Sequence, residues 1–141
     1  MFLDASVIVA ILAREPGYEH IVKRIEEGDG PIFTSPMARF EAVVSFARAK
    51  SFGAKGVRPT PDEIDASAKV IDGFLASLRA REVSISEGVG KRAIEAARDY
   101  GKVVGHPADL NLGDCFAYAC AKAYRLRLVY KGDDFSKTDL A

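Results

Sequence analysis

The chain has 141 residues, of which 48% are hydrophobic, which is enough apolar side chain to build one core. Its 20 Lys and Arg residues balance 20 Asp and Glu residues, so the formal net charge is zero. This balance argues against strong non-specific electrostatic binding to nucleic acid, although a local basic rim can still hold a phosphate chain. Cys115 and Cys120 are too few for a zinc site or a disulfide framework, and we expect two reduced core thiols.

The first fifty residues predict two strands and three helices. An apolar strand at 1–4 precedes a largely buried helix at 6–15, and a second helix follows at 18–30. A short strand bounded by prolines lies at 31–36, and apolar side chains at helical spacing predict a strong helix at 37–50. The leading apolar run is too short to span a bilayer and lacks a basic leader, so we expect a soluble cytoplasmic protein.

The rest of the chain begins with a turn-rich segment, 51–61, which predicts an exposed loop. Thr60 is followed by a proline and two acids, a pattern that predicts a capped helix running to about Arg81. The later segments predict, in order, a strand at 82–86, a helix at 86–101, an irregular loop at 102–112, a helix at 113–125 and a strand at 126–135 that ends in an acidic turn.

Short apolar strands that alternate with helices are typical of an α/β protein with a mostly parallel sheet covered on both faces. In such sheets functional groups gather beyond the carboxyl ends of the strands. Asp4 follows the first predicted strand, and Asp133 and Asp134 follow the last. Asp114 opens the helix before that last strand. The pattern therefore predicts that acidic side chains meet at one edge of the sheet.

Each acidic residue also has an ordinary explanation. Asp4 or Ser6, and likewise Asp114, suit helix N-caps. Glu41 lies in an otherwise apolar helix and suits an ion pair with a nearby arginine, whereas the aspartates at 133–134 suit a solvated turn. Taken together these explanations are weaker, because the fold is expected to bring the acids to one place.

Clustered carboxylates repel one another by roughly 4 kcal/mol per pair at 4 Å with an effective dielectric constant of 20. They stay ionised together only when a cation neutralises them. A ligand set of oxygen atoms without histidine or cysteine favours Mg²⁺ or Mn²⁺, ions that support phosphodiester cleavage.

Four stretches carry a family resemblance: "MFLDAS", Glu41 in its apolar helix, "GHPADLNLGDCFAYACAKA" and "LVYKGDDFSKTDL". They resemble the PIN-domain ribonucleases and, within these, the VapC toxins of bacterial toxin–antitoxin (VapBC) pairs. The resemblance spans essentially the whole chain and is most specific over 105–139. It implies a single PIN domain over 1–141, built as a three-layer α/β/α sandwich. The segment 51–61 departs from the tighter connection of most members.

The resemblance also implies a Mg²⁺-dependent endoribonuclease site, in which Mn²⁺ can substitute. Asp4 and Asp114 match the principal metal ligands, and Glu41 matches an acid that completes the site directly or through water. The fourth acid falls in the "GDDF" turn, where the spacing before Phe135 favours Asp134 and Asp133 remains an alternative.

Further expectations follow from the same resemblance. Ser6 matches a hydroxyl that supports the metal site. The implied partners are a VapB-type antitoxin, an RNA substrate and a second copy of the chain. Apart from the resemblance, the sequence offers Arg39, Lys55, Arg58 and Lys131 as basic residues suited to binding RNA phosphates, although solvated surface is the commoner explanation for any one of them. Lys131 is the best placed, beside the acidic turn.

Two alternatives stay open at this point. The first is a catalytically inert PIN-like module that binds RNA or protein. The second is a phosphatase of the haloacid-dehalogenase type, which also places an aspartate after its first strand. That family requires a second aspartate two residues later, where this chain has Ser6.

Overall fold

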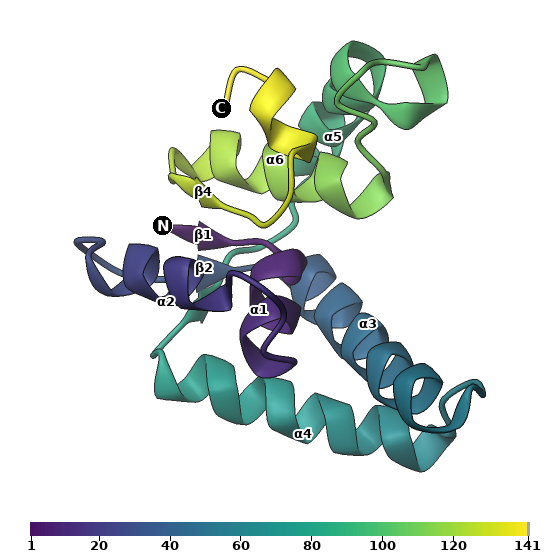
Figure 1. Ribbon diagram of the computed structural model, residues 1–141. Helices are drawn as coiled ribbons and strands as arrows, with labels where there is room; N and C mark the ends of the chain where they lie inside the picture. Colours follow the sequence, from purple (N-terminus) through teal and green to yellow (C-terminus); the bar gives the residue numbers. More distant parts are fainter. Residues whose placement is uncertain (141) are drawn as a thin grey trace.

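A computed structural model describes residues 1–140, without the side chains of residues 52–55. Within these residues, pairs of α-helices separate four successive strands, and two short 3₁₀ helices lie in the last third of the chain (Figure 1). In chain order they are β1 (Phe2–Leu3), α1 (Ala5–Leu12), α2 (Tyr18–Glu26), β2 (Phe33–Thr34), α3 (Pro36–Lys55), α4 (Pro61–Ser77), β3 (Arg81–Glu82), α5 (Glu87–Tyr100), η1 (Lys102–Val104), α6 (Leu112–Tyr124), β4 (Leu128–Val129) and η2 (Asp134–Lys137).

The four strands form one sheet in the order β3-β2-β1-β4, and every neighbouring pair is parallel. Phe2 of β1 is the central register residue, since it pairs with Phe33 of β2 on one side and Leu128 of β4 on the other. All four predicted strands are present. The third strand was predicted at 82–86 but lies at Arg81–Glu82, where it pairs with β2. Ser86, which was expected to end the strand, is the N-cap of α5.

Helices cover both faces of this sheet, which confirms the predicted three-layer α/β/α architecture (Figure 1). Leu3 and Val129 point into a core built with α1, α2, α3 and α4. Their strand neighbours Phe2 and Leu128 point into a second core built with α5 and α6. The alternation follows from the two-residue period of a strand, and it explains why both strands are apolar at consecutive positions.

The order of the strands explains the division of the helices between the two faces. The chain moves from β1 to β2 to β3 in one direction and then returns across the sheet to β4. Because parallel crossovers share one hand, reversing the direction transfers the connecting helices to the opposite face. The reversal leaves β1 and β4 side by side, with a crevice between the connections that leave their carboxyl ends.

The prediction of an exposed loop over 51–61 is wrong in its first half. Helix α3 continues to Lys55 and ends only at Gly56, whose φ of 64° lies in the left-handed region. Glycine adopts this conformation without a steric penalty and commonly terminates helices. The predicted cap at Thr60 is confirmed, since Thr60 and Glu63 form a reciprocal capping box at the start of α4.

None of the helices in residues 1–140 combines the length and the hydropathy needed to cross a bilayer. Both cysteines are buried and free, as expected, and both belong to the core on the α5–α6 face.

Candidate active site

A pocket of about 440 Å³ opens at the crevice between β1 and β4, and it collects the four acids singled out in the sequence. Asp4 follows β1, Glu41 lies in α3, Asp114 lies in the first turn of α6 and Asp134 begins η2. The complete lining is Asp4, Ala5, Ser6, Val9, Glu15, Glu41, Ser45, Asn111, Asp114, Lys131, Gly132 and Asp134. These four acids from separate parts of the chain therefore face one volume, together with a fifth acid, Glu15.

Asp4 is the most deeply placed of the four, with 4% of its surface exposed. Its carboxylate accepts hydrogen bonds from the Ser6 backbone N–H at 3.0 Å and from the Ser6 hydroxyl at 2.5 Å. Ser6 Oγ in turn accepts the backbone N–H of Lys131 at 3.0 Å. Asp4 is thus the N-cap of α1, and Ser6 ties it to the turn that follows β4.

Asp114 is held by a capping box at the start of α6. The Asn111 side chain accepts the backbone N–H groups of Gly113 and Asp114, and the Asp114 carboxylate accepts the backbone N–H of Asn111 at 2.8 Å. The helix therefore begins one residue before the predicted start, with Asn111 as its cap. Asp114 is therefore not the N-cap that the sequence suggested but the third residue of the capping box. This role is compatible with a place in the pocket, because only one of its carboxylate oxygens accepts the Asn111 N–H.

Glu41 has no ion-pair partner among the residues whose side chains the structure describes, so the expected alternative of a pair with an arginine is wrong. Its carboxylate lies over the first turn of α6, against the Cα of Gly113. A half-buried carboxylate without a cationic partner is costly to keep ionised, unless the pocket receives positive charge from elsewhere.

The acidic turn after β4 separates its two aspartates. Both side chains are exposed, but Asp134 lines the pocket and interacts electrostatically with Asp4 and Asp114, whereas Asp133 does not contribute to the lining. Phe135 anchors the turn in the core, as predicted, with 1% of its surface exposed and its ring packed on Tyr130.

The predicted basic residues are placed differently from one another. Lys131 lines the pocket and pairs with Glu15, a residue that no sequence pattern indicated. Arg39 lies outside the lining and makes a two-pronged pair with Asp72 of α4 at 2.7 and 2.8 Å. Arg58 lines a separate hollow beside α3, and the Lys55 side chain lies outside the described residues.

Burial and mutual repulsion raise the pKa of three of these acids. The pKa of Glu41 rises from 4.5 to about 7. Burial is the largest cause, and the negative charges of Asp4 and Asp114 add to it. Burial also raises the pKa of Asp114 to about 6, with further upward contributions from Asp4 and Asp134 that the Asn111 hydrogen bond opposes. Burial raises the pKa of Asp4 against its Ser6 hydrogen bonds.

These shifts predict how the stability of the metal-free protein depends on pH. Native Glu41 holds its proton more tightly than the unfolded chain does, so the resulting stabilisation is complete below pH 4.5 and is lost as the pH rises through about 7. In EDTA, we expect Glu41→Gln to raise Tm over wild type by roughly 3 °C to 6 °C near pH 8 and much less near pH 5.

Thermal unfolding of both proteins across this pH range measures the difference. Glu26→Gln, at an exposed position on α2, is the control and should shift Tm little at either pH. A Tm difference between Glu41→Gln and wild type that stays the same at every pH would show that ionisation of Glu41 does not destabilise the native protein.

The donor set of the pocket fits a hard divalent cation. Apart from Lys131, the other polar side chains of the lining are the Ser6 and Ser45 hydroxyls, the Asn111 amide and the Glu15 carboxylate. The ligand atoms that the pocket offers are therefore oxygens, which Mg²⁺ and Mn²⁺ prefer. Within residues 1–140 no three acidic, histidine or cysteine side chains already converge on one ion position. Mg²⁺ keeps several water ligands and commonly binds through one or two carboxylates, so an open set of this kind is suitable for it.

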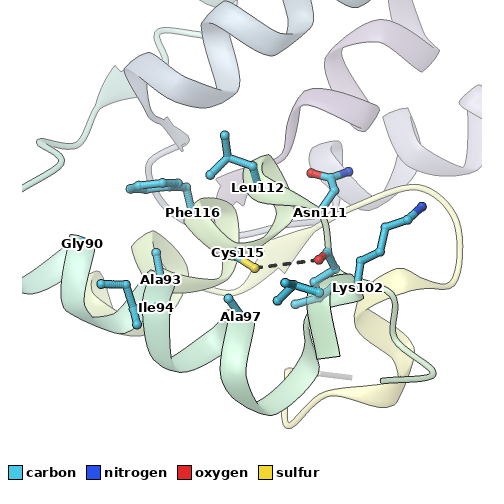
Figure 2. Close-up of a pocket in the computed structure, with 11 residues that line it drawn as sticks. Gly90, Ala93, Ile94, Ala97, Lys102, Asn111, Leu112, Cys115 and Phe116 are labelled. Atoms are coloured by element: carbon cyan, nitrogen blue, oxygen red, sulfur yellow. Dashed lines mark hydrogen bonds between the residues drawn. The ribbon is translucent and has the colours of Figure 1, made fainter. Parts of the chain in front are cut away.

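A second, apolar pocket of about 680 Å³ lies on the neighbouring surface between α5, η1 and α6 (Figure 2). Ile94, Val103 and Leu112 line it and are largely exposed. Asn111 lines both pockets, so the apolar surface begins where the acidic one ends.

Comparison with known proteins identifies the class. The family model for the PIN domain matches residues 1–140, and the chain belongs to this family. A VapC ribonuclease of Rhizobium meliloti is 51% identical over 139 residues, covering 99% of this chain and 98% of that protein. Ribonuclease VapC42 of Mycobacterium tuberculosis is 32% identical over 140 residues, covering 99% and 96%.

A solved structure shares the fold. VapC20 of Mycobacterium tuberculosis, described as a sarcin-ricin loop cleaving toxin, superposes with a TM-score of 0.64. The match covers 96% of this chain and 92% of VapC20, at 15% sequence identity.

Proposed function

We propose that this protein is a Mg²⁺-dependent endoribonuclease and the toxin of a VapBC-type toxin–antitoxin system. The observation that carries the proposal is the single pocket at the β1–β4 crevice that these four acids from separate parts of the chain line. Its relatives are VapC ribonucleases that match it over nearly the full length of both chains. RNA is the proposed substrate, and the cytoplasm, where RNA is available, is the proposed location.

In this proposal Asp4 and Asp114 ligate the metal, and Glu41 and Asp134 complete the site directly or through water. A divalent cation held by these acids would supply activation of a water molecule and would offset negative charge on the phosphodiester. Ser6 holds Asp4 in place through two hydrogen bonds. Lys131 is the only basic residue in the pocket lining as described, and its ammonium group binds an RNA phosphate at the pocket mouth.

Cleavage of RNA by the purified protein tests the proposal. We expect cleavage in millimolar Mg²⁺ or Mn²⁺, loss of cleavage in EDTA, and recovery when excess Mg²⁺ is restored. The inert alternative predicts binding of RNA or protein without cleavage under any of these conditions. Cleavage that persists in EDTA would rule out a metal-dependent mechanism.

The proposed protein partner is a VapB-type antitoxin. An acidic pocket attracts a basic side chain, and an arginine from the antitoxin would take the electrostatic place of the cation. Ile11, Leu12, Phe40 and Val44 are the side chains we expect to line its groove, and Phe40 is exposed beside Glu41. Co-purification of an adjacently encoded antitoxin, with suppression of cleavage, tests this partner.

A homodimer is the proposed assembly. The exposed apolar side chains around the α5–α6 pocket support it, because a contiguous apolar surface of this kind commonly marks an interface. Light scattering from the purified protein measures the mass directly, and a monomer at micromolar concentration would contradict the assignment.

A further inference from the structure

The Glu41 carboxylate occupies the space in which Gly113 would carry a side chain. A Cβ atom built on Gly113 would overlap both carboxylate oxygens of Glu41 and its Cδ atom. Gly113 is buried in the first turn of α6, and Glu41 lies on α3, the helix packed against that turn. Hydrogen is therefore the only substituent at position 113 that leaves Glu41 where it is.

The backbone of Gly113 does not require glycine. Its φ is not in the left-handed region, and it sits at a helical position in the first turn of α6, where alanine is a better helix former than glycine. Glycine here therefore costs helix stability, and the close approach of the Glu41 carboxylate supplies the reason for it. The capping box holds Asn111, Gly113 and Asp114 together, because the Asn111 side chain accepts the N–H groups of both other residues, so the turn cannot move aside without disrupting Asp114.

We propose that Gly113 is a positioning residue for the acidic pocket: the absence of its side chain forms a slot that admits the Glu41 carboxylate beside Asp114. The inference rests on the proposed metal-dependent function and adds the element that determines where Glu41 lies. Because the obstructed group is the end of a flexible side chain, a methyl group at 113 displaces Glu41 rather than the helix.

Gly113→Ala is the direct test. The variant keeps or raises its Tm in EDTA, since alanine favours the helix, while its Mn²⁺ affinity falls roughly 10-fold and its Mg²⁺-dependent cleavage falls on the order of 10-fold to 100-fold. Gly73→Ala is the matched control, because Gly73 lies inside α4 with no atom within 4 Å of a built Cβ. It should raise Tm similarly and leave Mn²⁺ affinity and cleavage unchanged.

A double-mutant cycle with Glu41→Ala distinguishes positioning from a general structural effect. Titration calorimetry with Mn²⁺ alone measures affinity for wild type, each single variant and the double variant. Once Glu41 is truncated, Gly113→Ala should weaken Mn²⁺ binding no further. Glu41→Asp, which is shorter by one methylene, should recover part of the affinity and cleavage when combined with Gly113→Ala.

Two results would overturn the proposed role of Gly113. One is an unchanged Mn²⁺ affinity in Gly113→Ala. The other is a loss of affinity on Gly113→Ala that is equally large in the Glu41 and Glu41→Ala backgrounds. The proposed function fails separately, if wild type binds Mn²⁺ but cleaves no RNA. In that case the calorimetric cycle still decides whether Gly113 positions Glu41.

Discussion

Asp114→Asn should abolish RNA cleavage while leaving the fold intact. Loss of outer residues around a bound metal typically costs 10-fold to 100-fold in activity, so removal of a direct ligand should cost on the order of 100-fold or more. The asparagine side chain can still accept the Asn111 backbone N–H, so the capping box that starts α6 survives. The change removes a charge and retains the shape.

The same substitution should not destabilise the metal-free protein at neutral pH. Asp114 is a buried acid that Asp4 and Asp134 repel, and its pKa is raised to about 6. Neutralising it relieves that repulsion, so Tm in EDTA near pH 7.5 should equal or exceed that of wild type. Cleavage rates and thermal unfolding, measured on the same preparations, separate loss of chemistry from loss of structure.

Asp109→Asn is a matched control for Asp114→Asn. Asp109 lies in the loop just before α6, pairs with Lys102 on the surface and does not line the acidic pocket. Its substitution by asparagine should leave the cleavage rate within about 2-fold of wild type. Wild-type, metal-dependent cleavage by Asp114→Asn would remove Asp114 from the site.

Asp134→Ala should reduce cleavage far more than Asp133→Ala, although the two residues are adjacent. Asp134 faces the pocket and interacts with Asp4 and Asp114, whereas Asp133 lies outside the lining. We expect a loss on the order of 10-fold to 100-fold for Asp134→Ala and within about 2-fold for Asp133→Ala. Phe135 stays buried in both variants and keeps the turn in place.

RNA affinity, measured beside cleavage for the two variants, distinguishes the enzyme from an inert binding module. For the enzyme, affinity changes little in either variant while cleavage falls in one. For the module, no protein cleaves RNA in Mg²⁺, and affinity rises when either negative charge is removed. Equal and negligible effects on cleavage would place the fourth acid outside this turn.

Local sequence patterns determined the elements of the fold and three acids of the candidate site. The spacing of apolar residues and the identity of capping residues depend only on neighbouring positions. The strands, the cap of α4 and the buried helix after Asp114 can therefore be predicted from the sequence. The end of α3 was misplaced because Gly53 and Gly56 are both plausible helix terminators, and only the backbone conformation distinguishes them.

The choice between Asp133 and Asp134 required the tertiary structure. Both follow β4, and the sequence favoured Asp134 only through a family spacing. Burial of Phe135 in the α5–α6 core fixes the orientation of the turn, and that orientation turns Asp134 toward Asp4. The pairing of Lys131 with Glu15 likewise joins residues 116 positions apart, a separation over which no local pattern carries information.

The pocket itself is a product of topology and packing. The sequence placed acids at strand ends, but the reversal of the chain between β3 and β4 brings β4 beside β1 and with it Asp134 toward Asp4. Glu41 enters the same volume because α3 packs against the first turn of α6 at a glycine. Residue types and periods are set along the chain, whereas contacts between α3 and α6 arise only when both helices bury their apolar faces against the sheet.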